Sequence, residues 1–121
     1  MPQQFCCYMA FPHHHTCFVT LQKLSDKFHL VAPDYPGYGN SSMPSVDEFN
    51  YTFENMAKII SKFVETIGLK NYSLYMQDYG APIGYRLFSM YPEKVQAFII
   101  QNGLLNCLLL LCCIMILIII N

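Results

Sequence analysis

The alternation of helix and strand patterns between residues 16 and 100 is the strongest constraint on the fold of this chain. In its clearest helix, apolar residues recur at helical spacing and form one continuous face: Phe53, Met56, Ala57, Ile60, Phe63, Val64 and Ile67. Thr52 is a good N-cap for this helix, and Gly68 is a good residue to end it. We expect strands over 29–33, 72–77 and 95–100, and further helices ending near Lys27 and running from about Ala81 to Tyr91. This order predicts an α/β fold, with a parallel sheet and helices on its faces.

An apolar tail follows these elements and differs from them in composition. Residues 104–120 read LLNCLLLLCCIMILIII, with Asn106 as the only polar side chain. We therefore divide the chain into residues 1–103, of ordinary globular composition, and a hydrophobic tail over residues 104–120. As an apolar helix the tail would span about 25 Å, just short of the roughly 30 Å hydrocarbon core of a membrane. Two interpretations stay open: a transmembrane anchor, or sequence beyond a truncation point that has no evolved function.

The charge and cysteine content exclude several classes of function. The chain has 121 residues, a formal net charge of −1, 12% charged residues and no run of like charges. It therefore lacks the basic surface of a nucleic-acid-binding protein. Its six cysteines form no CxxC motif and no zinc-type spacing with histidine, so we expect neither a metal site nor a disulfide framework. The first residues do not resemble a secretory signal, which favours a cytoplasmic protein, free or anchored to a membrane by its tail.

The segment YSLYMQDYGAPIGYRL, residues 72–87, has the form strand, reactive side chain, glycine, helix. A sharp strand-to-helix turn raises the side chain at its apex above the sheet, and the helix N-terminus offers N–H groups to developing negative charge. Asp78 stands at this apex, and Gly80 and Ala81 supply the small residues that a tight turn needs. An aspartate is ionised at neutral pH, so it can attack an electrophilic carbon and form a covalent ester. The structural alternative is that Asp78 only caps the following helix.

Together with an earlier loop, this motif resembles the α/β-hydrolase superfamily, and most closely its aspartate-nucleophile branch of haloalkane dehalogenases and soluble epoxide hydrolases. The resemblance covers roughly residues 9–103, through HLVAPDYPGYGNSSMP and the segment from Tyr51 to Gly103. It implies a partial α/β-hydrolase fold in which Asp78 is the catalytic nucleophile and the backbone N–H groups of Tyr79 and Phe11 are oxyanion donors. The resemblance also implies a structural acid at Asp34, a small-molecule electrophile as substrate and no cofactor.

Some residues depart from the family pattern. Met76 stands where many of these turns carry a small residue, so we expect it to crowd the turn. Tyr79 stands where the dehalogenases carry a halide-binding tryptophan, which favours epoxide or ester chemistry over halide release. The family's catalytic histidine and its partner acid belong beyond residue 103 and have no counterpart here, and Gln101 does not ionise. His13–His15 are interpreted as part of a polar loop, with a substitute base as the alternative.

The family resemblance implies hydrolysis of epoxides, haloalkanes or related small electrophiles through an aspartyl ester. For this chain three alternatives remain: a truncated hydrolase of this kind, an inactive remnant that is membrane-anchored or binds a partner, and a split enzyme completed by another chain or by self-association. We also expect the strand over 95–100 to leave the sheet with an unpaired edge.

Overall fold

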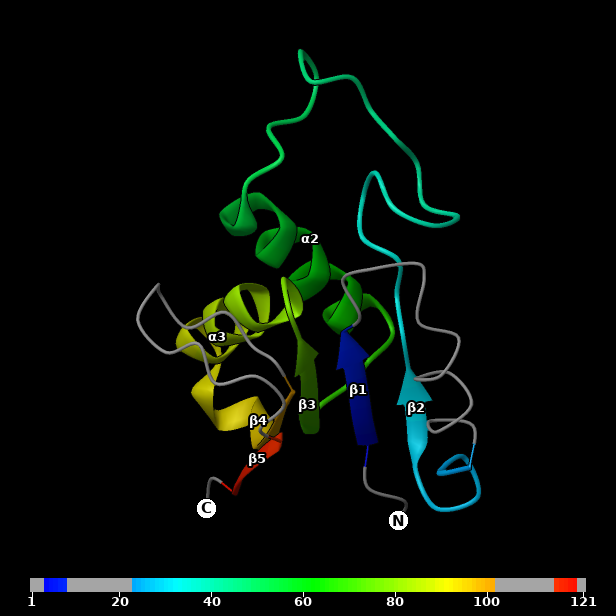
Figure 1. The fold of residues 1–121 in the computed structure, drawn as a ribbon, viewed down its shortest axis with the longest axis vertical. Coiled ribbons are helices and arrows are strands. Elements are labelled where there is room, and N and C mark those ends of the chain that lie inside the picture. Colours follow the sequence, from blue (N-terminus) through cyan, green and yellow to red (C-terminus); the bar gives the residue numbers. More distant parts are fainter. Residues whose placement is uncertain (1–3, 9–22, 102–114, 120–121) are drawn as a thin grey trace.

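The computed structural model describes residues 4–8, 23–101 and 115–119 of the chain. Five strands form one sheet in the order β2-β1-β3-β4-β5 (Figure 1). These strands are β1 (Gln4–Tyr8), β2 (His29–Val31), β3 (Tyr72–Gln77), β4 (Val95–Gln101) and β5 (Met115–Ile119). The helices are α2 (Phe53–Thr66), α3 (Gly80–Met90) and the short 3-10 helix η1 (Pro92–Lys94).

Strands β1 to β4 are parallel, as the alternation of helices and strands predicted. β1 pairs with β2 on one side and with β3 on the other, and β3 pairs with β4. Parallel neighbours need long crossover connections, and α2 and α3 lie within those connections. The α/β fold class is therefore confirmed. β1 itself was not predicted, because the five residues Gln4–Tyr8 are too few to show a period, and pairing on both sides places it.

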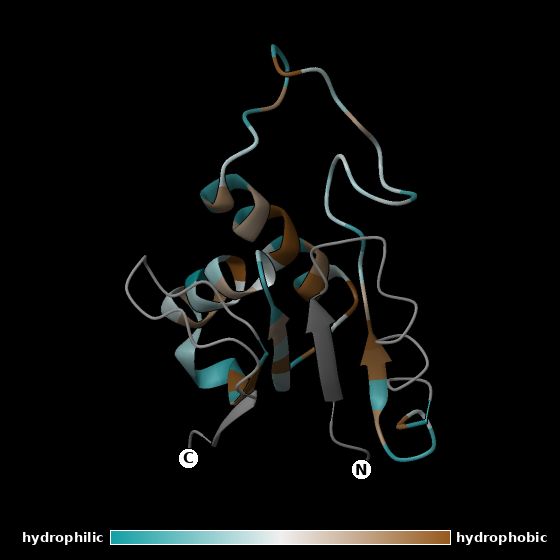
Figure 2. Ribbon diagram, viewed as in Figure 1, coloured by the Kyte–Doolittle hydropathy of each residue, from teal (hydrophilic) through white to brown (hydrophobic). Residues whose placement is uncertain are grey.

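Helices α2 and α3 cover one face of the sheet and bury the main core against it. Thr52 is the N-cap of α2, where its Oγ1 accepts a hydrogen bond from the Asn55 N–H at 3.2 Å, and Gly68 follows the helix with a φ of +73°. Figure 2 shows apolar and hydrophilic segments alternating along α2, as expected for a helix with one buried face. The core combines residues of both helices with alternate residues of β3 and β4, including Met56, Ile60, Val64, Leu74, Met76, Leu87 and Phe98.

The segment before α2 consists of turns and a long loop. Residues 23–27, the expected end of the first helix, form turns in which the N–H groups of Lys27 and Phe28 both donate to the Leu24 carbonyl at 3.0 Å. The beginning of that expected helix lies outside the described residues. Further along, the Ser45 N–H donates to Glu48 Oε2 at 3.4 Å, which is half of a capping box.

Strand β5 corrects the prediction for the tail. Met115–Ile119 pair antiparallel with β4, so this part of the tail is a strand and not an apolar helix, and β4 is not an unpaired edge. Isoleucine-rich sequence suits a strand, and the outer edge of β4 supplies free backbone N–H and C=O groups. Residues 102–114 lie outside the described part of the chain. Among the helices that the structure describes, none combines the length and apolar character needed to cross a membrane.

Candidate active site

The turn between β3 and α3 holds Asp78 in a backbone conformation that is unusual for its residue type. Asp78 has a φ of +48°, and among the described residues it is the only non-glycine with a positive φ. β3 ends one residue before Asp78, and α3 begins two residues after it, at Gly80. The Asp78 carbonyl accepts a hydrogen bond from the Ala81 N–H at 3.2 Å, which closes the turn. This is the strained strand-to-helix turn that the motif predicted.

The alternative role of Asp78, as a cap of α3, has no support in the geometry. The N-cap residue of α3 is Tyr79, and no side chain makes a capping hydrogen bond there. Because the side chain of Asp78 is not used to complete the helix, its carboxylate can serve another purpose. The N-terminal turn of α3 adds backbone N–H groups beside it, a favourable place for negative charge.

Met76 does not crowd the turn, contrary to the expectation from its size. Its side chain is fully buried, and it packs against Gly84 in the second turn of α3. A Cβ built on Gly84 would overlap the Met76 sulfur and lie 2.9 Å from its Cγ. The missing side chain at position 84 therefore makes the space that the large residue at position 76 requires.

The loop after β2 is organised around Asp34. Its Oδ2 accepts a hydrogen bond from the Asn40 N–H at 3.0 Å, and its carbonyl accepts one from the Ser41 hydroxyl at 2.7 Å. Gly39 has a φ of +54°, and a Cβ at this position would lie 2.7 Å from Asp34 Oδ1. These contacts fit the structural role that the resemblance implied for Asp34.

The other predicted site residues are placed only in part. Tyr79 is 44% exposed, and its ring stacks on Phe53 with 6.0 Å between ring centroids and 26° between planes. Phe11, the second predicted oxyanion donor, and His13–His15 lie outside the described residues. Gln101 accepts a short hydrogen bond from the Tyr75 hydroxyl, across β3 and β4. Within the described part of the chain, no three His, Cys, Asp or Glu side chains gather in a way that could hold a metal ion.

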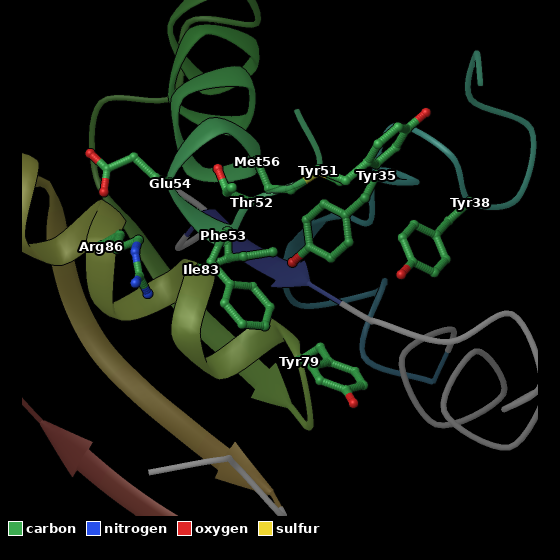
Figure 3. Close-up of a pocket in the computed structure, with 10 residues that line it drawn as sticks. All are labelled: Tyr35, Tyr38, Tyr51, Thr52, Phe53, Glu54, Met56, Tyr79, Ile83 and Arg86. Atoms are coloured by element: carbon green, nitrogen blue, oxygen red, sulfur yellow. The ribbon is translucent and has the colours of Figure 1, made fainter. Parts of the chain in front are cut away.

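A pocket of about 460 Å³ opens next to the turn, and the sequence analysis did not predict it. Figure 3 shows side chains from the loop after β2, from the start of α2 and from α3 around it. Phe53, the first residue of the apolar face expected for this helix, is 38% exposed and forms part of the wall. In the sequence, Tyr35 and Tyr38 flank Gly37, and this pair was the available signal for an aromatic pocket wall. The lining residues are Tyr35, Tyr38, Tyr51, Thr52, Phe53, Glu54, Met56, Tyr79, Ile83 and Arg86.

Comparisons with known proteins agree with this geometry. A family model described as alpha/beta hydrolase fold matches residues 9–112. An uncharacterized hydrolase of Saccharomyces cerevisiae is 31% identical over 80 residues, which cover 66% of this chain and 27% of the yeast protein. Haloalkane dehalogenase 2 of Mycobacterium tuberculosis is 37% identical over 79 residues, covering 65% of this chain and 27% of that enzyme.

Solved structures show the same likeness in three dimensions. A mutant of the haloalkane dehalogenase DatA from Agrobacterium tumefaciens superposes with a TM-score of 0.72 at 26% sequence identity. The superposition covers 84% of this chain and 34% of the dehalogenase. The chain thus spans about a quarter of the length of the curated relatives it matches, with 27% of each covered.

Proposed function

We propose, because this chain belongs to the alpha/beta hydrolase fold family, that Asp78 is the nucleophile of a hydrolase-type reaction on a small electrophile. The observation that carries this proposal is the positive φ of Asp78 at the end of β3, directly before α3. Such strain costs of order 1–3 kcal/mol and is typical of residues held in place for function. The curated relatives include haloalkane dehalogenases, which supports a carbon electrophile as the target.

The first step of the proposed reaction forms a covalent ester. With an epoxide, one carboxylate oxygen of Asp78 attacks a ring carbon, the bond from that carbon to the ring oxygen breaks, and the released alkoxide takes a proton from solvent. With a haloalkane, the same attack expels halide. The backbone N–H of Tyr79, together with that of Phe11, would stabilise negative charge in this site.

The second step, hydrolysis of the ester, needs a general base that activates water. The 121 residues contain four histidines, at positions 13, 14, 15 and 29. The registers of β1 with β2 and β3 place His29 level with Tyr72, six residues before Asp78 along parallel strands. Six residues of extended chain span about 20 Å, so His29 is too far away to serve as the base. We therefore expect this polypeptide to form the ester once and to turn over only if His13–His15 or a further chain supplies the base.

The chemistry of position 79 favours an epoxide over a haloalkane. A departing halide needs a hydrogen-bond donor beside the nucleophile, whereas the alkoxide of an opened epoxide can be neutralised by a proton. The Tyr79 ring stacks on Phe53, and both residues line the neighbouring pocket. That packing supports a positioning or shielding role for Tyr79 more than a halide-binding role.

The experiment is intact-mass analysis of the full chain after incubation with a small reactive epoxide, and in parallel with a primary bromoalkane. We expect a single hydroxyalkyl adduct, mapped by peptide analysis to Asp78 and absent from Asp78→Asn. Asp47→Asn is the matched control, because Asp47 is an exposed carboxylate in a turn before α2. Equal labelling of wild type and Asp78→Asn would refute the nucleophile assignment. The absence of any adduct on folded protein would favour the inactive or partner-binding alternative, and sustained turnover would point to a base outside the described residues.

A further inference from the structure

The pocket beside the turn has features of a built binding site that is separate from Asp78. Its volume of about 460 Å³ lies in the range of small-molecule sites. Asp78 is not among its lining residues, although its neighbour Tyr79 is. The walls come from three segments: the loop after β2, the first turn of α2, and one face of α3 (Figure 3).

The aromatic wall on the loop side is fixed in position. The Tyr51 hydroxyl donates a hydrogen bond to the Pro44 carbonyl at 2.6 Å, and its ring meets Phe49 edge-to-face at 4.8 Å between centroids. The same ring lies against the backbone of Gly37, where an added Cβ would be 2.8 Å from Tyr51 Cε1. These contacts hold in place the loop that also carries Tyr35 and Tyr38, so this side of the pocket loses little entropy when a ligand binds.

The opposite wall adds a stacked aromatic pair. The rings of Phe53 and Tyr79 lie nearly parallel, at 26°, and both are partly exposed toward the pocket. Figure 3 shows Tyr35 and Tyr38 reaching toward them from the loop after β2. A flat, apolar ring system inserted here would meet aromatic faces and edges on both sides, which is a favourable arrangement for aromatic contacts.

Arg86 supplies charge at one end of the pocket. Its guanidinium donates to the Pro82 carbonyl at 2.8 Å and lies 5.8 Å from the centroid of the Phe53 ring, which leaves other N–H donors unused by these contacts. It makes no ion pair with an acid among the described residues, whereas Glu54 lies 3.9 Å from Lys58. Of the two charged residues in the lining, Glu54 is therefore paired with Lys58, and Arg86 is the one that has no acidic partner among the described residues.

From this combination, we propose that the pocket binds a small planar aromatic carboxylate, with its ring between the Phe53–Tyr79 pair and the loop tyrosines and its carboxylate on Arg86. The ring provides apolar and aromatic contact, and the guanidinium matches the fork of a carboxylate. The ligand is held without chemical change, so this site is distinct from the proposed nucleophile.

Calorimetric titration of the full chain tests the proposal, with 2-naphthoate as the acid and 2-naphthamide as its neutral counterpart. Arg86→Gln should weaken 2-naphthoate about tenfold and change 2-naphthamide less than about twofold, because only the charged hydrogen bonds are lost. Phe53→Ala should weaken both ligands, and circular dichroism checks that this variant is folded. Lys62→Gln, which removes an exposed charge of α2 outside the pocket, should change neither ligand.

Three outcomes would overturn the proposal. One is the absence of saturable binding of 2-naphthoate to folded wild-type protein. Another is equal loss of both ligands in Arg86→Gln, which would show that the guanidinium does not read the carboxylate. The third is loss of 2-naphthoate binding in Asp78→Asn, which would place the probe at the turn and not in the pocket. Retained binding in Asp78→Asn supports the pocket whether or not Asp78 proves to be a nucleophile.

Discussion

The contact between Met76 and Gly84 makes a sharp prediction about the stability of the turn. In an exposed helix, Gly→Ala stabilises by about 1 kcal/mol because alanine loses less backbone entropy. At position 84 the new methyl group would overlap the Met76 sulfur, 2.9 Å from its Cγ and 3.6 Å from Leu74 Cδ1. Met76 and Leu74 are fully buried, so neither has open space into which it can turn. We expect Gly84→Ala to destabilise the protein.

The magnitude follows from two opposing effects. Overpacking of a filled core costs about 1–3 kcal/mol, and the gain in helix propensity offsets about 1 kcal/mol of that cost. The net loss from Gly84→Ala should therefore be about 1 kcal/mol. Met76→Ala alone leaves a cavity and should cost about 2–5 kcal/mol. In the Met76→Ala background the clash is gone, so adding Gly84→Ala should stabilise by about 1 kcal/mol.

A double-mutant cycle measures this reversal of sign. The assay is urea denaturation followed by far-ultraviolet circular dichroism, with the free energy of unfolding taken from each transition. Gly68→Ala is the control, since Gly68 has a φ of +73° and nothing within 4 Å of an added Cβ. Its cost of about 1 kcal/mol should be the same in both backgrounds. If Gly84→Ala destabilises equally with Met76 and with alanine at position 76, the two residues are not coupled and the explanation of the turn is wrong.

Three further predictions concern other parts of the fold. The Tyr85 hydroxyl is buried without a hydrogen-bond partner among the described residues, so Tyr85→Phe should raise the free energy of unfolding by up to about 1 kcal/mol at neutral pH. Burial raises the pKa of Tyr85 above its ordinary value, so wild type should lose stability as pH rises past the tyrosine pKa of the unfolded chain. Urea titrations at neutral and alkaline pH should show a smaller loss of stability in Tyr85→Phe than in wild type. Equal losses in the two proteins would contradict this explanation. Leu117→Pro should detach β5, because proline lacks the backbone N–H and restricts the strand, and the exposed β4 should then exchange its amide hydrogens faster. Unchanged protection of the β4 amides would disprove this prediction. Gly39→Ala should cost about 1–3 kcal/mol in urea denaturation because its Cβ would meet the Asp34 carboxylate, and a neutral effect would argue against that contact.

The sequence pattern predicted helices α2 and α3 and the three strands β2, β3 and β4. The apolar face of α2 and its Thr52 cap are local signals, and so is the short strand before Asp78. The sharp turn at Asp78 was also predicted from local signals, and the structure adds that Asp78 takes a positive φ in it. These features depend on residues close in sequence, which is why the sequence alone contains them.

The parts that could not be predicted depend on contacts between distant residues. β1 is a strand because it lies between β2 and β3, and β5 is a strand because it finds the edge of β4. The pocket joins Tyr38 to Arg86, residues far apart in the chain. The large side chain of Met76 fits the turn because Gly84, eight positions later and on another element, leaves space for it.

Strand β5 also bears on the idea of an enzyme completed by a second chain. Strands from a partner can join this sheet only at its two edges, and β5 already occupies the outer side of β4. The opposite edge is β2, which has only three residues and offers few backbone groups for pairing. Because β5 belongs to the same chain, its local concentration at the β4 edge far exceeds that of a separate partner. A complementing strand that pairs with β4 must therefore displace β5, and Leu117→Pro should favour that association.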